Sequence, residues 1–198
     1  MAKIGLFGGS FNPIHKGHMN LAATVKEKLG LDRIILIPSG TAPHKSSVEY
    51  APAEDRLEMC RIACEGMEGF EVSDYEISNS RKSYTVYTVR HFKGLFPNDE
   101  LYLLVGSDML LSFESWFEYR EILKKTAIAA ISRNGEDEAK LVKMSEKLSE
   151  YGRCIVVNAE AITISSSEIR KMIKNNADSS CYLNGKVVKY IILKNLYR

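Results

Sequence analysis

Residues 3–30 read KIGLFGGSFNPIHKGHMNLAATVKEKLG, an apolar run followed by a glycine-rich turn and a helical pattern. The run Lys3–Gly8 predicts a buried β-strand, and the pattern His18–Leu29 predicts an amphipathic helix. Gly30 follows as the residue type most often found just beyond a helix C-terminus. A strand that turns through glycines into a helix is typical of α/β folds, and the helix N-terminus in such a turn can bind an anion.

The glycine-rich turn, Gly8–Phe11, offers backbone rather than long side chains to a ligand. Gly8 and Gly9 lack a Cβ atom, so a ligand can approach their backbone closely. The N–H groups of Ser10 and Phe11 would then face an anion such as phosphate. The turn matches neither the GxGxxG of dinucleotide-binding folds nor the GxxxxGK[ST] of P-loops, so neither of those sites is predicted.

Two histidines, His15 and His18, flank the predicted start of the helix. An imidazole there can donate a hydrogen bond to a phosphate oxygen, and a protonated ring adds positive charge. The same spacing also suits metal ligands or residues that cap the helix. The residues alone leave these three roles open.

Short apolar runs alternate with amphipathic patterns along the whole chain. The candidate strands are Lys3–Gly8, Arg33–Pro38, Phe70–Ile77, Leu101–Val105, Ala127–Ser132 and Cys154–Val157. The candidate helices are His18–Leu29, one from about Pro52, Tyr84–Phe92, Trp116–Lys124, Glu138–Tyr151, Ser167–Lys174 and Lys186–Leu196. Such alternation predicts a three-layer, Rossmann-like α/β fold, a parallel sheet of about five to six strands with helices on both faces. We expect one domain over residues 1–198.

Polar, glycine- or serine-rich stretches follow five of the predicted strands. They read GGSFNPIHKGH, PSGTAPHK, GSDML, SRNG and ITISSSEIR. The carboxyl ends of parallel strands share one edge of the sheet, and ligands bind there in open α/β folds. The five stretches therefore predict one site at this edge.

The stretch ISSSEIR, residues 164–170, opens a predicted helix and contains a capping-box spacing from Ser165 to Glu168. Hydroxyls of Ser166 and Ser167, the helix N-terminus and the Arg170 guanidinium together favour a second phosphate contact. A well-capped helix without a ligand explains the same residues. If the phosphate reading holds, the C-terminal part, from about residue 160, completes the phosphate site.

Other chemistry-bearing residues have weaker signals. His44 and Lys45 could contact an anion or lie on an exposed loop. Asp108, two residues after Gly106, could accept hydrogen bonds from ribose hydroxyls or cap the next helix.

Tyr84, Thr85 and Trp116 are three further candidates. Tyr84 and Thr85 start a predicted helix, which they could cap and pack. Trp116 is the only tryptophan, and its ring could stack on a ligand or pack in the core.

The composition is that of a soluble globular protein, 45% hydrophobic and 26% charged, with a net charge of +2. We find no leader or membrane-spanning pattern and expect a cytoplasmic protein with no membrane or nucleic-acid partner. Cys60, Cys64, Cys154 and Cys181 form no CxxC pair, which favours free thiols. The sequence leaves open whether the chain forms a homodimer.

Two of these stretches together resemble the signatures of the nucleotidylyltransferase superfamily. GGSFNPIHKGH resembles its (H/T)xGH signature, and ISSSEIR resembles its ISSTxIR signature. Within the superfamily the chain most resembles bacterial nicotinate-nucleotide adenylyltransferases. PSGTAPHK resembles their PxxxPPHK loop, and DYEISNSRKSYTVYT resembles their DxELxRxGxSYTxDT stretch. LLVGSDML, ISRNG and VVKYIILKNLY follow in the expected order, so the resemblance spans essentially the whole chain.

The resemblance implies adenylyl transfer from ATP to the 5′-phosphate of nicotinate mononucleotide, which yields deamido-NAD and pyrophosphate. A phosphate is already a competent nucleophile, so the protein has to position the substrates and stabilise charge. The resemblance also implies that Mg²⁺ arrives on ATP with few protein ligands, and no metal site of the protein's own.

The resemblance also assigns roles to individual residues. The catalytic contacts to the ATP phosphates fall to His15, His18 and Arg170. The other ATP-binding residues are Gly8, Gly9, Ser10, Phe11, Gly106, Asp108, Ser132, Arg133, Ser166 and Ser167. The nicotinate mononucleotide site falls to His44, Lys45, Tyr84, Thr85 and Trp116, with Trp116 stacking.

Four residues depart from the family pattern. Asn79, Arg81, Tyr87 and Asn134 stand where Arg, Gly, Asp and Pro are usual. Four alternatives share parts of the pattern. The PHK and SYT stretches argue against a pantetheine-phosphate adenylyltransferase, and a carboxylate-binding pocket would decide against a nicotinamide-preferring relative. The intact His15, His18 and Arg170 weigh against a non-catalytic nucleotide-binding regulator, and the lack of a KMSKS loop against a class I tRNA synthetase fragment.

Overall fold

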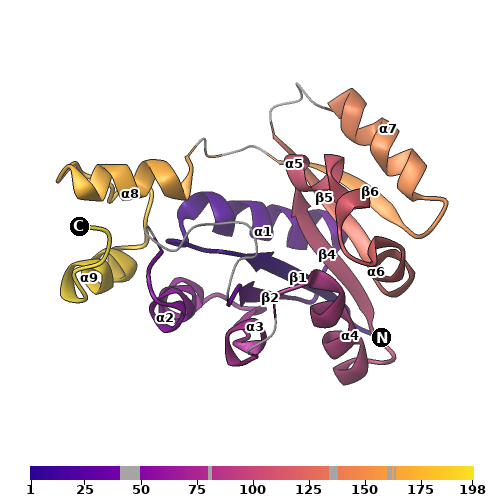
Figure 1. Ribbon diagram of the computed structural model, residues 1–198, viewed down its shortest axis with the longest axis horizontal. Helices are drawn as coiled ribbons and strands as arrows, with labels where there is room; N and C mark the ends of the chain where they lie inside the picture. The colour runs from indigo at the N-terminus through magenta and orange to yellow at the C-terminus, as the bar shows by residue number, and fades with distance from the viewer. Residues whose placement is uncertain (41–49, 80–81, 134–137, 160–161, 163) are drawn as a thin grey trace.

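The computed structural model describes residues 1–40, 50–79, 82–133, 138–159, 162 and 164–198. In this part of the chain one sheet of six parallel strands runs through the molecule in the order β3-β2-β1-β4-β5-β6 (Figure 1). The strands are β1 (Lys3–Gly9), β2 (Arg33–Pro38), β3 (Phe70–Val72), β4 (Glu100–Gly106), β5 (Ala127–Arg133) and β6 (Cys154–Ala159).

Helices connect the strands and cover the sheet (Figure 1). They are α1 (Lys16–Leu29), α2 (Ala53–Cys64), α3 (Tyr75–Ser78), α4 (Thr85–Leu95), α5 (Ser107–Leu111), the 3₁₀ turn η2 (Phe113–Ser115), α6 (Tyr119–Lys125), α7 (Glu138–Leu148), α8 (Ser166–Lys174) and α9 (Gly185–Leu193). The three-layer, Rossmann-like fold expected from the sequence is confirmed.

Strand residues alternate between two apolar clusters, one on each face of the sheet. Ile34 and Leu36 of β2 belong to the cluster that holds residues of α1, α2 and α9. Ile35 and Ile37 belong to the cluster under α4, α6 and α7. Both faces of the sheet are therefore buried, which explains why the strand sequences are nearly continuous runs of apolar residues.

The direction in which the chain crosses the sheet reverses between β1 and β4, which lie side by side with Leu6 opposite Leu103. Strands that follow β1 are added on one side, and strands that follow β4 on the other. The loops after β1 and β4 therefore diverge, and the crevice between them is where open α/β sheets bind ligands. Gly9 and Gly106 end these two strands.

Most predicted elements are confirmed to within a few residues, and two are corrected. The predicted strand Phe70–Ile77 ends at Val72, because the carbonyl of Asp74 accepts hydrogen bonds from Ile77 and Ser78 and starts the short helix α3. The predicted helix Trp116–Lys124 begins only at Tyr119. Glu118 before it adopts a left-handed conformation with φ of 54°, which separates η2 from α6.

Two details at α1 and α2 agree with the sequence. Gly30 ends α1 in the left-handed conformation, with φ of 60°. Cys60 and Cys64 lie buried on α2 with free thiols, and burial raises the pKa of Cys64 to about 11. These thiols remain protonated at neutral pH and act as apolar side chains.

None of the helices in the described ranges combines the length and apolar character that crossing a bilayer requires.

Candidate active site

The glycine-rich loop after β1 is shaped by Phe11. Its side chain is 1% exposed, and its backbone has φ of 43°, so the chain turns sharply there. The ring packs edge-on against Phe7 and His18, with centroid distances of 5.4 and 5.2 Å. A Cβ atom at position 9 would lie 2.9 Å from this ring, so Gly9 is needed for packing. A Cβ at Gly8 would meet nothing within 4 Å, which leaves open space beside the strand end.

His15 and His18 cap α1 reciprocally. The backbone N–H of His18 donates to His15 Nδ1 at 3.4 Å, and that of His15 donates to His18 Nδ1 at 3.3 Å. The two rings stack with centroids 3.7 Å apart. Because Nδ1 accepts a hydrogen bond in each ring, the proton of a neutral imidazole lies on Nε2, which makes Nε2 a donor.

The metal-ligand role considered for the two histidines finds no support in the described ranges. There, no three His, Cys, Asp or Glu side chains gather closely enough to hold a metal ion. The capping role is observed, and it engages Nδ1 of each ring rather than Nε2. The cap and the anion contact are therefore compatible rather than alternative.

Gly17 lets the His15 ring lie against the first turn of α1. A Cβ at this position would approach His15 Nδ1 to 3.0 Å and the carbonyl oxygen of Ile162 to 3.3 Å. Both distances are shorter than ordinary van der Waals contacts. Gly17 therefore fixes the place of the His15 ring, and any larger residue would displace it.

The start of α8 packs onto the loop that follows β1. Ser165 caps α8 in a capping box with Glu168, as the spacing predicts. The Ser166 hydroxyl donates to the carbonyl of Pro13 at 3.0 Å, and Arg170 Nη1 donates to the carbonyl of Asn12 at 3.0 Å. The structure thus brings the two signature segments, 153 to 158 residues apart, into direct contact.

Arg170 is half-buried and tied to its own helix as well. Its Nη2 atom donates to Ser167 Oγ at 3.3 Å. Arg170 and Ser167 also border a cavity of about 300 Å³ between α8 and the C-terminal residues. The guanidinium is therefore held in place beside open space.

Asn12 joins three segments and was not singled out from the sequence. Its side-chain Oδ1 accepts hydrogen bonds from the backbone N–H of Ala51 at 3.0 Å and the hydroxyl of Tyr197 at 2.9 Å. Its own carbonyl accepts from Arg170. The Asn12 side chain is 1% exposed. Burial raises the pKa of the Tyr197 hydroxyl, so Tyr197 stays protonated at neutral pH and continues to donate to Asn12.

An aromatic cavity of about 320 Å³ lies beside the start of α4. It brings together three of the predicted residues, Tyr84, Thr85 and Trp116. Phe117 and Met109 add apolar walls that are 47% and 48% exposed. The Trp116 ring packs against Phe113 at 4.8 Å, so the indole is supported from the core side. No lysine or arginine is among the described residues that line the cavity.

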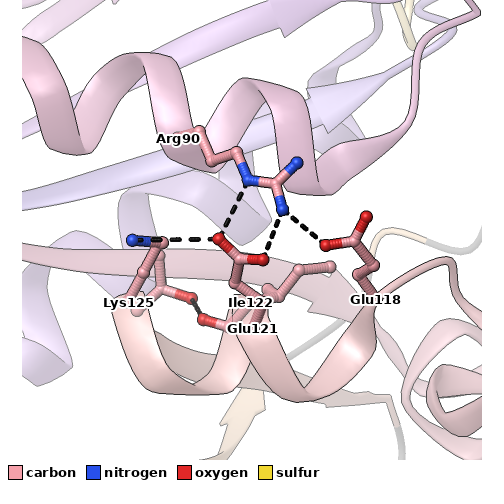
Figure 2. A network of polar contacts seen from close by, with 6 residues as sticks. Arg90, Glu118, Glu121, Ile122 and Lys125 are labelled. Carbon is pink, nitrogen blue, oxygen red and sulfur yellow. Dashed lines mark hydrogen bonds and ion pairs between the residues drawn. The ribbon is translucent and has the colours of Figure 1, made fainter.

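An ion-pair network holds the two helices that flank this cavity. Figure 2 shows Arg90 of α4 reaching Glu118 and Glu121 at the start of α6. Arg90 Nε donates to Glu121 Oε1 at 2.9 Å, and Lys125 lies 3.9 Å from the same oxygen. The guanidinium lowers the pKa of Glu121 to about 2. The network fixes the segment that carries Trp116 relative to α4.

Four of the remaining predicted residues lie at or just after the ends of β4 and β5. Gly106 caps α5, and Asp108 lies in its first turn with an exposed side chain, rather than capping the helix. The Ser132 side chain is 1% exposed at the end of β5, so its contact with a ligand would run through the backbone. Arg133 is the last residue of β5. His44 and Lys45 lie outside the described residues.

Two of the four departures from the family pattern can be described. Asn79 follows α3, and its Nδ2 donates to the carbonyl of Tyr75 at 2.6 Å. Tyr87 lies in α4 with its ring 6.1 Å from that of Tyr84 and beneath the Arg90 guanidinium at 5.7 Å. Arg81 and Asn134 lie outside the described residues.

The sequence profile of the cytidylyltransferase-like family matches residues 6–172. The chain belongs to the cytidylyltransferase-like family. This match runs from within β1 to within α8 and so spans both signature segments. The sequence-based identification of a nucleotidyltransferase is confirmed with it.

Full-length relatives show which members of the family this chain resembles in sequence. The chain is 37% identical to a probable nicotinate-nucleotide adenylyltransferase of Caldicellulosiruptor saccharolyticus over 99% of both chains. It is 39% identical to one of Carboxydothermus hydrogenoformans, over 100% of this chain and 98% of the relative. The expected resemblance to nicotinate-nucleotide adenylyltransferases is therefore confirmed.

A solved structure supports the fold. The nicotinic acid mononucleotide adenylyltransferase of Plasmodium falciparum, complexed with NaAD, superposes with a TM-score of 0.81 at 25% identity. The superposition covers 100% of this chain and 98% of the other. The cytidylyltransferase-like chain thus shares the fold of that protein over its described length.

Proposed function

We propose that the protein transfers the adenylyl group of ATP to nicotinate mononucleotide, which forms deamido-NAD and releases pyrophosphate. The observation that carries the proposal is the contact between α8 and the loop after β1. Ser166 and Arg170 donate to the carbonyls of Pro13 and Asn12, next to the stacked pair His15 and His18. Two helix N-termini, two imidazoles and a guanidinium thereby gather where a triphosphate would lie.

The chemistry requires positioning and charge stabilisation rather than a covalent intermediate. An oxygen of the mononucleotide 5′-phosphate attacks the α-phosphorus of ATP in line. The bond from that phosphorus to the bridging oxygen breaks, and pyrophosphate leaves with the electron pair. His15 and His18 donate from Nε2 and Arg170 from its guanidinium to the phosphates on which negative charge accumulates. Mg²⁺ would arrive with the substrate, as Mg-ATP, and would offset part of the negative charge of the phosphates.

The aromatic cavity suits the pyridine ring of the second substrate. Trp116 and Tyr84 offer faces for stacking, and Thr85 offers a hydroxyl. The cavity also borders the N-terminus of α4, which begins at Thr85. Unpaired N–H groups and the helix dipole there favour a carboxylate, even without a lysine or arginine on the described walls. This arrangement supports nicotinate over nicotinamide as the preferred ring.

The other predicted residues complete the proposed site. ATP would contact the backbone of Gly8, Gly9, Ser10 and Phe11, and the mononucleotide phosphate would contact His44 and Lys45. Gly106, Asp108, Ser132 and Arg133 would line the nucleoside site at the ends of β4 and β5. Residues from about 160 to 198 would complete the phosphate site through Ser166, Ser167 and Arg170, so that residues 1–198 act as one unit.

A single assay tests the proposal. The protein is incubated with Mg-ATP and, in parallel, with nicotinate mononucleotide, nicotinamide mononucleotide or phosphopantetheine, and pyrophosphate release is measured. We expect the highest kcat/KM with nicotinate mononucleotide. Equal or faster release with phosphopantetheine would instead identify a pantetheine-phosphate adenylyltransferase, and no release with any substrate would indicate a nucleotide-binding regulator.

A further inference from the structure

Arg56 of α2 is a buried cation that the proposed mechanism does not use. The residue is 2% exposed, and desolvation lowers the pKa of its guanidinium. In the described ranges no carboxylate forms an ion pair with it. Its charge is instead satisfied by backbone oxygens and by the Tyr50 ring, whose centroid lies 5.7 Å away. A buried arginine of this kind requires an explanation, because burying a charge without a carboxylate partner is costly.

Three backbone carbonyls from three different segments accept hydrogen bonds from Arg56. Nη1 donates to Ser10 at 2.7 Å, Nη2 to Gly40 at 3.1 Å and Nε to Ala51 at 3.2 Å. Ser10 lies in the loop after β1, and Gly40 lies directly after β2. Ala51 lies just before α2. One guanidinium thus connects the carboxyl ends of two neighbouring strands.

Gly40 directly precedes residues 41–49, which include the predicted binding residues His44 and Lys45, and Ala51 follows them after Tyr50. The same side chain therefore holds one described residue on each side of this stretch. Ala51 is also held from its other side, because its N–H donates to Asn12 Oδ1. The distance of Gly40 and Ala51 from the glycine-rich loop is thereby fixed by Arg56 and Asn12.

The attachment at Gly40 leaves no space for adjustment. A Cβ at this position would lie 2.4 Å from the carbonyl oxygen of Glu76 in α3. The preceding Ser39 N–H donates to the carbonyl of Gly9 at 2.8 Å. Gly40 is therefore confined between α3 and Arg56, and a change at Arg56 would be transmitted to the end of β2.

The Ser10 contact also orients the peptide that faces the phosphate site. A trans peptide is planar, with its C=O and N–H on opposite sides. Because the Ser10 carbonyl points to Arg56, the N–H of Phe11 in the same peptide points away from Arg56. A lysine could not replace these contacts, since its ammonium is a single point on a flexible stem, whereas the guanidinium is a rigid planar fork with five donors.

We propose that Arg56 is a positioning residue for adenylyl transfer, which holds the glycine-rich loop, Gly40 and Ala51 in the arrangement that the two substrates require. This inference rests on the proposed function. Arg56 contacts no substrate in it, and acts through Ser10, Gly40 and Ala51.

The test compares Arg56→Lys and Arg56→Ala with the control Arg61→Ala. Arg61 lies on the same helix, is half-exposed and pairs only loosely with Glu58, at 3.6 Å. Steady-state pyrophosphate release is measured with each substrate varied, alongside circular dichroism and Tm. We expect Arg56→Lys to remain folded and to lose about 10²-fold in kcat/KM for both substrates. A displacement of substrate-binding groups by about 1 Å can cause a loss of this size. Arg61→Ala should keep wild-type kinetics.

Chemical rescue separates positioning from a merely structural role. Arg56→Ala leaves a buried space of guanidinium shape. We expect added guanidinium, at concentrations far below those that unfold proteins, to restore turnover in a saturable way, whereas methylammonium should not. A residue needed only for stability would give no such selectivity between the two cations.

The outcomes are distinct. An inactive wild-type protein would overturn the proposed function, and this inference with it. An active wild type with a folded, fully active Arg56→Lys variant would overturn the inference alone, as would a folded Arg56→Ala variant that guanidinium does not rescue. If Arg56→Ala does not fold, the kinetics of Arg56→Lys decide the question.

Discussion

Arg170 Nη1 donates a hydrogen bond of 3.0 Å to the carbonyl oxygen of Asn12, 158 residues earlier in the chain. Asn12 lies in the loop after β1, and Arg170 lies on the first turns of α8. The contact holds the guanidinium against the loop that leads from β1 to α1. The geometry at Arg170 and at four other positions leads to the predictions below.

Replacing Arg170 should impair catalysis more than folding. Arg170→Met keeps much of the side-chain volume but removes the donor to Asn12 and, in the proposed mechanism, the donors to the substrate phosphates. We expect kcat to fall by about 10²–10³-fold, the usual loss for one transition-state donor. Arg170→Lys should recover only part of this, because an ammonium cannot reproduce the fork. Pyrophosphate release and Tm measure both effects, and wild-type turnover in Arg170→Met would remove Arg170 from the mechanism.

His18 can be tested for capping and catalysis separately. Gln at the third helical position can reach back to the N-cap backbone, so His18→Gln can retain the capping box while it removes the imidazole. We expect near wild-type stability and a turnover lowered by orders of magnitude. His18→Ala should lose the same turnover and also about 1 kcal/mol of unfolding free energy, the typical value of a cap. If His18→Gln retains full activity, His18 serves only as a cap.

Gly17 and Gly94 form a matched pair of helical glycines. Alanine favours a helix over glycine by about 0.5–1 kcal/mol. A Cβ at Gly94 in α4 meets nothing within 4 Å, so Gly94→Ala should raise Tm without changing activity. A Cβ at Gly17 approaches His15 Nδ1 to 3.0 Å, so Gly17→Ala should displace the ring and lower kcat/KM. Similar kinetics for the two variants would show that the place of the His15 ring is unimportant.

Trp116 should act on the mononucleotide and not on ATP. We expect Trp116→Ala to raise KM for nicotinate mononucleotide roughly 10- to 100-fold, since base–aromatic stacking is worth about 1–3 kcal/mol. KM for ATP should stay near the wild-type value. Trp116→Phe, which keeps an aromatic face, should show a smaller change. An equal rise of both KM values would argue that Trp116 supports the fold rather than the ring pocket.

The Arg90 network should make stability depend on pH in acid. The pKa of Glu121 is about 2 in the folded protein, against an ordinary value of 4.5. The network therefore contributes fully above about pH 4.5, and its contribution is lost as the pH falls toward 2. The side chains are about one-third exposed, so salt should weaken the effect.

Arg90→Met should flatten this pH dependence. Urea unfolding across the acid range, at low and high salt, measures it. Arg61→Met, on an exposed face of α2, serves as the control and should leave the acid dependence unchanged. An unchanged slope in Arg90→Met would mean that the network contributes nothing to stability.

The fold could be predicted from sequence because the parallel strands are buried on both faces. Runs such as Ile34–Ile37 and Leu101–Val105 are made of buried hydrophobic residues and have well-marked ends. The prediction was wrong where tertiary contacts dominate. Tyr75 stacks on His91 at 3.9 Å and Glu76 accepts from Thr88 at 2.7 Å, contacts that turn the end of Phe70–Ile77 into α3. Local alternation of side chains carries no sign of these partners.

The candidate site was predictable only in its local motifs. Gly17, His15 and His18 are close in sequence, and their spacing alone left a capping role among the possibilities. Arg56 and Asn12 gave no local signal, because their partners lie up to 46 and 185 residues away. From sequence, an arginine in an amphipathic helix is expected to be exposed to solvent. Only the three-dimensional structure shows the backbone carbonyls that bind the buried Arg56.

The hydrogen bonds of Asn12 also bear on how the protein is made. The Asn12 side chain can accept its hydrogen bond from Tyr197 only after Tyr197 has been synthesised, and the Asn12 carbonyl can accept from Arg170 only after Arg170 has been synthesised. On the ribosome, the loop after β1 emerges well before these partners, which follow it 158 and 185 residues later. The sheet from β3 to β5 can begin to form during synthesis, but the loop after β1 cannot meet α8 until α8 has emerged. Nascent chains stalled before α8 should therefore hold an incomplete site on a largely assembled sheet.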